Sequence, residues 1–142
     1  MNTRNKAARV LVASGATVLV AAALLHLSDY PKDLSAVSAS NLRASLQRAV
    51  RALYFLVGWD WIVIAIIALI SAFTVAKSRI VIVLSCGFAV LVNMALMLAF
   101  MGWFIGTDMV LGSALMILCG GMLLSEGRDR KPGAISTLDG HV

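Results

Sequence analysis

Long apolar runs dominate this chain and restrict its fold more than any other feature. Between Ala7 and Glu126 they are interrupted by one polar stretch, residues 28–52, and by short breaks at 77–79 and 102–108. A run of about 20 apolar residues predicts a helix that crosses a bilayer, because a rise of about 1.5 Å per residue covers the hydrocarbon core. The pattern therefore predicts an all-α integral membrane protein.

The composition excludes several classes of protein. The chain is 61% hydrophobic and 13% charged, whereas soluble domains are about 45–50% apolar and about 25% charged. The net charge of +5 does not indicate nucleic-acid binding, because the basic residues flank apolar runs instead of clustering on a soluble face. Cys86 and Cys119 lie inside apolar runs and form no CxxC pair, so the sequence predicts neither a redox motif nor a zinc site.

The runs predict four spans in one transmembrane domain over residues 1–126. We expect these spans at residues 8–27, 57–76, 80–102 and 107–124. The first run exceeds the apolar core of a signal peptide, which favours a retained helix over a cleaved one. The short breaks permit only helical hairpins between neighbours, so we expect an up-down four-helix bundle. The charged end at 127–142 is typical of a disordered cytoplasmic tail.

The polar stretch at 28–52 predicts an extracytoplasmic loop. Pro31 disfavours helix at the residue before it, so we expect the chain to turn there. From Leu42 to Leu53 apolar side chains recur on one helical face, with arginines on another. This pattern predicts an amphipathic helix between the first and second spans, which either lies in the membrane interface or packs over the mouth of the bundle, and which can be continuous with the second span.

Basic residues near the span ends predict the orientation. Four of them flank the proposed outer ends: Lys32, Arg43, Arg48 and Arg51. Eight flank the opposite ends: Arg4, Lys6, Arg9, Lys77, Arg79, Arg128, Arg130 and Lys131. Because Lys and Arg are enriched in cytoplasmic segments, we expect both termini in the cytoplasm. The absence of an organelle address points to a bacterial inner membrane.

Three ionisable residues fall near the proposed outer ends of the spans and form a candidate polar site: His26, Asp60 and Asp108. A histidine between carboxylates can carry a proton or hold a metal ion. The alternative is structural: Asp108 caps the fourth helix, and Asp60 pairs with Arg48 or Arg51. The sequence favours the structural interpretation, and we expect neither a resident metal nor a cofactor.

Asn93 lies near the middle of the third span, where its carboxamide needs a partner. We expect a contact with a neighbouring helix or a second copy of the chain, the alternative being a substrate contact.

Met94, Met97 and Met101 share a face of this span. Thioethers bind Cu(I), but methionine also fills irregular gaps between helices, which is the role we expect here.

Small residues predict where helices approach closely. The relevant positions are Gly15, Gly87, Gly112, Ser113, Gly120 and Gly121. In membranes such residues let helix backbones pack against one another. Gly102 and Gly106 have the spacing of a dimer motif but lie at a helix end, so we expect a turn there.

The sequence contains no nucleotide-binding loop, catalytic triad or metal-ligand spacing, so we expect no enzymatic activity. The first functional hypothesis is an accessory or scaffolding component that contacts membrane lipids and forms a homo-oligomer or joins a larger membrane complex, without nucleic acid. The alternative is a small transporter or channel that uses the outer acidic mouth. The second alternative is a lipid-binding protein or membrane enzyme in which Arg43, Arg48 and Arg51 contact an anionic headgroup.

Overall fold

The computed structural model describes residues 3–75 and 78–126, and over these residues the chain is helical apart from three short connections. The helices are α1 (Thr3–Ala39), α2 (Ala44–Phe73), α3 (Arg79–Met101) and α4 (Ile105–Glu126). Each is long and apolar enough to cross a membrane. The prediction of an all-helical chain with four apolar spans is therefore confirmed. The predicted tail at 127–142 lies outside the described residues.

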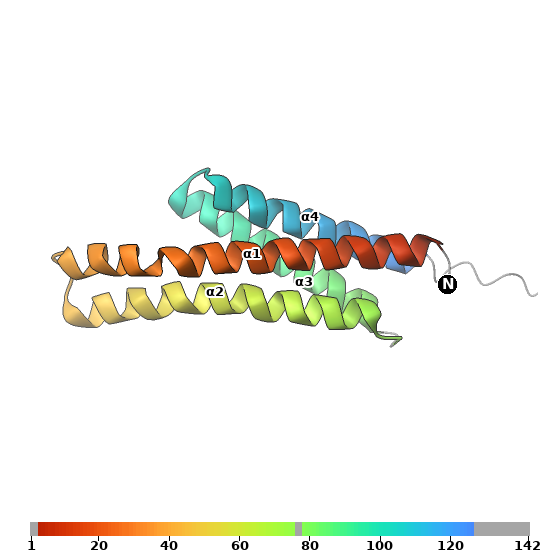
Figure 1. Cartoon of the computed structure of the whole chain (residues 1–142), viewed down its shortest axis with the longest axis horizontal. Coiled ribbons are helices and arrows are strands. Elements are labelled where there is room, and N and C mark those ends of the chain that lie inside the picture. The colour runs from red at the N-terminus through yellow and green to blue at the C-terminus, as the bar shows by residue number, and fades with distance from the viewer. Residues whose placement is uncertain (1–2, 76–77, 127–142) are drawn as a thin grey trace, which may run out of the picture.

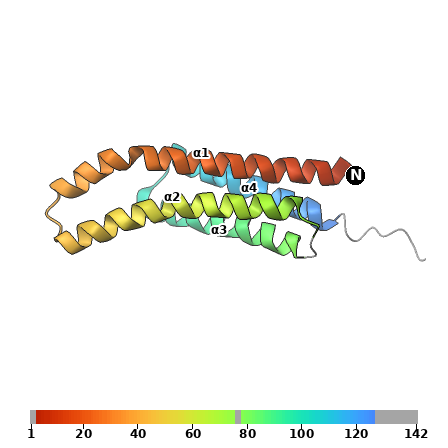
Figure 2. The same cartoon turned by 60° about the horizontal axis from the view of Figure 1, so that its bottom comes forward.

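Neighbouring helices in the sequence are also neighbours in space. α1 packs against α2 and α4, and α3 packs against the same two helices. Figures 1 and 2 show α1 and α2 as one long pair and α3 and α4 as a shorter pair. The connected end of the α1–α2 pair extends well past the connection between α3 and α4 (Figure 1).

Three contacts set the register between α1 and α2. Near one end, Cζ of Arg9 lies 5.4 Å from the centroid of the Phe73 ring. Farther along, His26 contacts Tyr54, and close to the connecting loop Arg51 Nη2 donates to Ser38 Oγ at 2.8 Å. The α2 residue number falls as the α1 number rises, so the two helices run antiparallel.

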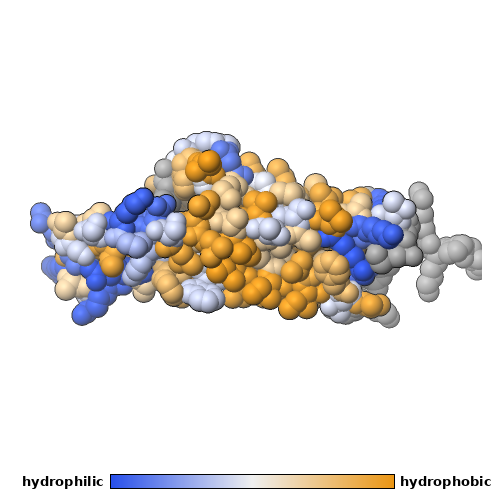
Figure 3. All heavy atoms as spheres, in the orientation of Figure 1, coloured by the Kyte–Doolittle hydropathy of each residue, from blue (hydrophilic) through white to orange (hydrophobic). Residues whose placement is uncertain are grey.

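The helices differ in length, and the difference leaves one pair unsupported at its end. α1 has 37 residues and α2 has 30, which correspond to about 55 Å and about 45 Å. α3 and α4, with 23 and 22 residues, span about 34 Å, close to the roughly 30 Å of a hydrocarbon core. We call residues 28–54 the projecting hairpin. Figure 3 shows a hydrophilic surface at this end and an apolar surface along the middle of the molecule.

The expected turn at Pro31 is wrong. α1 continues through Pro31 to Ala39, and α2 begins at Ala44, so only residues 40–43 connect the two helices. Proline removes one helical hydrogen bond, the one to the carbonyl of Leu27, and helices tolerate this loss by bending. Figure 2 shows such a bend in the orange half of α1. Contacts with α2 on both sides of Pro31, at His26 and Ser38, hold the helix together.

The polar stretch 28–52 is helical apart from residues 40–43, because α1 continues to Ala39 and α2 begins at Ala44. The amphipathic segment is not a separate element. From Ala44 onward it forms the first turns of α2, so it is continuous with the helix that contains the predicted second span.

Small residues bring α1 and α4 into close contact, as predicted. A Cβ placed on Gly120 would lie 2.9 Å from the Ala8 carbonyl oxygen, and one on Gly15 would lie 3.0 Å from that of Ser113. The buried Ser113 hydroxyl donates to the Gly15 carbonyl oxygen at 2.8 Å. Gly87 and Gly121 are equally crowded by α4 and α3 side chains, whereas a Cβ on Gly112 would meet nothing within 4 Å. The close approach is therefore real at every predicted glycine except Gly112.

Methionines fill the space around this core. Met94, Met97 and Met109 are partly buried and pack against a cluster that contains Leu19, Trp61 and other buried residues of all four helices. Their position fits the gap-filling role expected from the sequence.

Candidate functional site

The candidate polar trio is dispersed in the structure. His26 is half-buried on α1, whereas Asp60 on α2 and Asp108 in the first turn of α4 are exposed. Within the described residues, no three His, Cys, Asp or Glu side chains come close enough to hold a metal ion. Trp61, and not its neighbour Asp60, lies beside His26, with 5.5 Å between the ring centroids.

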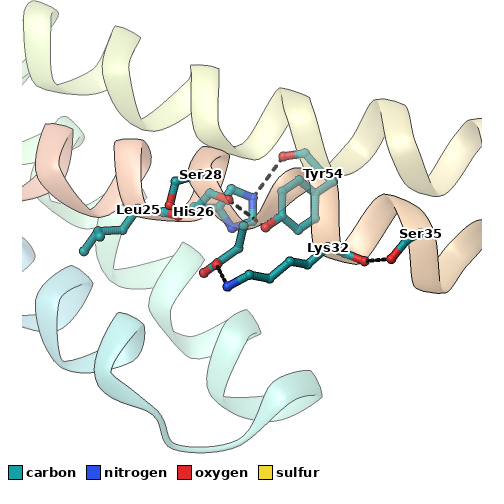
Figure 4. A network of polar contacts seen from close by, with 7 residues as sticks. Leu25, His26, Ser28, Lys32, Ser35 and Tyr54 are labelled. Carbon is teal, nitrogen blue, oxygen red and sulfur yellow. Dashed lines mark hydrogen bonds and ion pairs between the residues drawn. The ribbon is translucent and has the colours of Figure 1, made fainter.

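His26 and Tyr54 form a reciprocal clasp between α1 and α2. Tyr54 Oη donates to the His26 carbonyl oxygen at 2.6 Å, and His26 Nε2 lies 3.0 Å from the Tyr54 carbonyl oxygen. The two rings stack, with centroids 4.0 Å apart and planes inclined by 17°. Figure 4 shows both hydrogen bonds crossing between the helices. Each residue therefore binds the backbone of the other, which fixes the register of the pair.

The geometry of the clasp shows which atoms of His26 and Tyr54 carry protons. A carbonyl oxygen only accepts hydrogen bonds, so Nε2 of His26 must carry a proton. Burial raises the pKa of the Tyr54 phenol, and the nearby Asp33 carboxylate raises it further. The hydroxyl therefore stays protonated at neutral pH and remains a donor. Both groups are committed to backbone carbonyls, which suits a structural role and leaves Nε2 of His26 unable to accept a proton.

Aromatic rings extend the clasp in both directions. Tyr30 lies 5.5 Å from Tyr54 and 6.2 Å from Phe55, measured between ring centroids. Trp61 is only 2% exposed, and its indole Nε1 has no hydrogen-bond partner among the described residues. Edge and tilted ring pairs contribute about 0.5–1.5 kcal/mol each beyond their burial. The projecting hairpin is therefore anchored to the rest of the molecule by a row of rings.

A hollow between the arms of the hairpin is too small for a ligand. It measures about 10 Å³, which is room for about one water molecule. Its lining residues are Tyr30, Asp33, Leu34, Val37, Val50, Arg51 and Tyr54. Small-molecule sites measure about 300–1,000 Å³, so this hollow is a packing defect between two helices.

The amino end of α4 is capped by a residue other than the one expected. Thr107 Oγ1 accepts from the Phe104 backbone N–H at 3.0 Å and donates to the Phe104 carbonyl oxygen. Asp108 is exposed in the same turn, where its charge still meets the positive end of the helix dipole. The cap is therefore made by Thr107, and Asp108 contributes only electrostatically.

The expected ion pair of Asp60 is absent from the described residues. Arg51 donates instead to Ser38 across the hairpin, and Arg43 and Arg48 are exposed. Arg43 precedes α2, so it lies about 20 Å along the helix axis from residue 57, the predicted start of the span. Electrostatic attraction to headgroups is screened within about 8 Å. This distance weighs against a lipid contact by Arg43 when the hairpin stands upright.

The Asn93 side chain donates its hydrogen bond within its own helix. Its Nδ2 donates to the Ala89 carbonyl oxygen of α3 at 3.1 Å, and the side chain is half-buried. Within the described chain this donor is therefore satisfied in its own helix, and a contact of Asn93 with a second copy of the chain stays a prediction. In the part of the chain that the structure describes, the buried polar residues are Ser71, Thr107 and Ser113, and the rest of the core is apolar. Such an interior offers an ion few groups to replace its water.

The comparisons with known proteins add no identity. No family model matches the chain, and no curated protein or solved structure is similar to it at a significant level.

Sequence reasoning identified His26 but missed Tyr54, its partner. Two spacings of aromatic and histidine side chains in the sequence indicated this contact. His26 and Tyr30 are four residues apart and so share one face of α1, while Tyr54 and Trp61 are seven apart on one face of α2. Two aromatic faces on neighbouring helices predict a ring contact, although spacing alone does not give the register.

Proposed function

We propose that this chain is a scaffolding component of a membrane assembly, with no catalytic role. Its four helices cross the bilayer as an up-down bundle, and both termini lie in the cytoplasm. The projecting hairpin stands in the compartment outside a bacterial inner membrane and contacts another protein there. The apolar length of the helices and the distribution of basic residues support this orientation.

The single observation that carries the proposal is the projecting hairpin itself. α1 and α2 exceed the thickness of a hydrocarbon core by about 25 Å and about 15 Å, and they remain helical to their connection. The clasp of His26 and Tyr54 and the bond from Arg51 to Ser38 hold the two arms in one geometry. A pre-organised surface costs less conformational entropy on binding, which is the physical advantage of a scaffold.

The test shortens the hairpin and leaves the clasp intact. Removing residues 33–39 and 44–50 takes seven residues from each arm, which is close to two helical turns, so the remaining faces keep their directions. The retained connection at 40–43 and the pair His26 and Tyr54 should still close the helices. The native and shortened chains are crosslinked in cells, extracted in several mild detergents and analysed by mass spectrometry.

We expect the native chain to retain a specific partner that the shortened chain loses at equal expression. A native chain that is recovered as a monomer in every detergent, with no crosslinked partner, contradicts the scaffold. Retention of the same partner by both chains contradicts the role of the hairpin.

A further inference from the structure

One face of α2 carries an apolar stripe that no other part of the described chain covers. Leu42 begins the stripe just before the helix, and its positions then alternate by four and three residues along α2: Leu46, Ala49, Leu53, Leu56, Asp60, Val63, Ile67 and Ile70. All nine are exposed, and the four leucines are 41%, 50%, 62% and 60% exposed in chain order. Alternating four and three is the spacing of a coiled-coil seam, in which apolar side chains keep facing one partner helix.

Lipid accounts for only part of this stripe. Val63, Ile67 and Ile70 lie within the predicted span and can face acyl chains. Leu42, Leu46 and Leu53 belong to the projecting hairpin, where water would surround them. Because α2 is unbroken from Ala44 to Phe73, one partner helix can follow the stripe both inside the membrane and above it.

We infer that this stripe of α2 is the seam at which a second copy of the chain docks, in parallel and about a two-fold axis. A second copy presents an identical stripe at the same depth, so it can cover the surface along its whole length. This inference deepens the proposed function, since it rests on α2 crossing the bilayer and on the hairpin standing outside it.

The size and the flanks of the stripe fit this occupant. Seven large side chains, each about half exposed, offer several hundred Å² per copy, so pairing covers on the order of 1,000 Å², where specific interfaces begin. Outside the membrane the flanking positions on α2 are small or apolar, namely Ser45, Val50 and Ala52, and the flanking charge, Arg43, lies before the helix. Within α2 no like charges at these flanking positions oppose pairing, and small side chains let the two helices approach closely.

Asp60 is the one charged position in the stripe. In a parallel seam it would face its own copy, so the two carboxylates would repel each other. A single polar residue in a seam fixes the register and the number of strands at a cost in stability. Because Asp60 lies at the predicted outer end of the span, the pair remains accessible to water and counterions.

Cysteine crosslinking in intact membranes tests the seam. Cys86 and Cys119 are first replaced by alanine, and single cysteines are then introduced at each position from 42 to 56. In a two-fold seam a residue meets its own counterpart, so one cysteine per chain is sufficient to form a disulfide-linked dimer. We expect crosslinking at 46, 49, 53 and 56 to exceed that at 44, 48, 51 and 55 several-fold.

The second measurement compares the effect of a glutamate on the stripe with that of a glutamate on the opposite side of α2. With Ala49→Cys as the reporter, Leu46→Glu is expected to reduce crosslinking several-fold, whereas Ala44→Glu on the other side of α2 leaves it unchanged. Asp60→Asn is expected to increase crosslinking, because two carboxamides can hydrogen-bond where two carboxylates repel. A decrease with Asp60→Asn would place a cationic partner on the stripe and overturn the inference.

Uniform crosslinking along the helix, or adducts only with a different protein, would also overturn the inference. The two proposals fail separately. Loss of the dimer pattern while the hairpin still retains its partner removes the seam and leaves the scaffold. A dimer pattern without any co-purified partner keeps the seam and removes the scaffold.

Discussion

α1 contacts its two neighbours in opposite ways. Against α4 it packs through small residues, with backbone atoms so close that a Cβ on Gly15 or Gly120 finds no room. Against α2 it uses large rings, as His26 stacks on Tyr54 and lies beside Trp61. The α4 contact depends on the absence of side chains and the α2 contact on their shape. The α1–α4 contact is therefore sensitive to larger side chains, and the α1–α2 contact is sensitive to shorter ones.

The same contrast applies to hydrogen bonds. Ser113 reaches the Gly15 carbonyl from a fully buried position, whereas Arg51 reaches Ser38 across an exposed part of the hairpin. A buried bond is shielded from competing water, while an exposed one exchanges readily with it. We therefore expect the α1–α4 contact to dominate the free energy of unfolding and the hairpin tip to contribute little.

The largest effect is expected from enlarging a glycine in the α1–α4 contact. Gly120→Ala places a methyl group 2.9 Å from the Ala8 carbonyl oxygen and 3.1 Å from the Val12 backbone nitrogen. Overpacking of this kind costs about 1–3 kcal/mol, measured as the free energy of unfolding in mixed micelles. Gly112→Ala is the control, because its methyl group meets nothing within 4 Å. Equal losses for the two variants would contradict the description of this contact.

Removing one hydroxyl from the clasp should have an intermediate effect. Tyr54→Phe keeps the stacked ring but loses the donor to the His26 carbonyl oxygen, which should cost about 1 kcal/mol. Tyr30→Phe serves as the control, since the described structure gives its hydroxyl no hydrogen bond. Unfolding free energies and amide hydrogen exchange around residue 54 report the difference. If Tyr54→Phe cost no more stability than Tyr30→Phe, the hydrogen bond of the Tyr54 hydroxyl would not be what holds the clasp.

The smallest effect is expected at the tip of the hairpin. Ser38→Ala removes the acceptor of the Arg51 guanidinium at an exposed site, where the loss should be about 0.5 kcal/mol or less. We expect faster amide exchange confined to residues near the connection at 40–43, with the global free energy of unfolding unchanged. Ser35→Ala on the same arm is a suitable comparison, because its hydroxyl bonds only within its own turn of α1. A global loss of stability in Ser38→Ala would show that the hairpin and the bundle unfold together.

Local properties of the sequence were sufficient for part of the fold. Four apolar runs predicted four helices, and small residues predicted close contacts between helices, because run length and side-chain size are visible without a structure. That the closest of these contacts joins α1 to α4 was not predicted. The Pro31 turn failed for a physical reason. Local preference opposes helix at a proline, but helix continues on both sides and α2 supports the segment across the gap.

The candidate site was less predictable, because its geometry depends on how two helices align. His26 lies at the end of an apolar run in the sequence, and the structure stacks it on Tyr54, 28 residues away. Asp60 and Trp61 are adjacent in the sequence, but Asp60 is exposed and Trp61 is buried. A rotation of α2 by one residue would bury Asp60 and expose Trp61. Composition could not supply that rotation, which is set by the packing of Gly58 against Leu27 and of neighbouring pairs.

The continuity of α1 has a mechanical consequence. One rod touches α4 through Gly15 and reaches the hairpin tip at Ser38, with no break in between. A load applied at the tip is therefore transmitted as torque to α4, and the bend near Pro31 is the most compliant point along the way. Under the proposed function, attachment at the hairpin tip and tilt of α1 within the membrane are therefore coupled through this one helix.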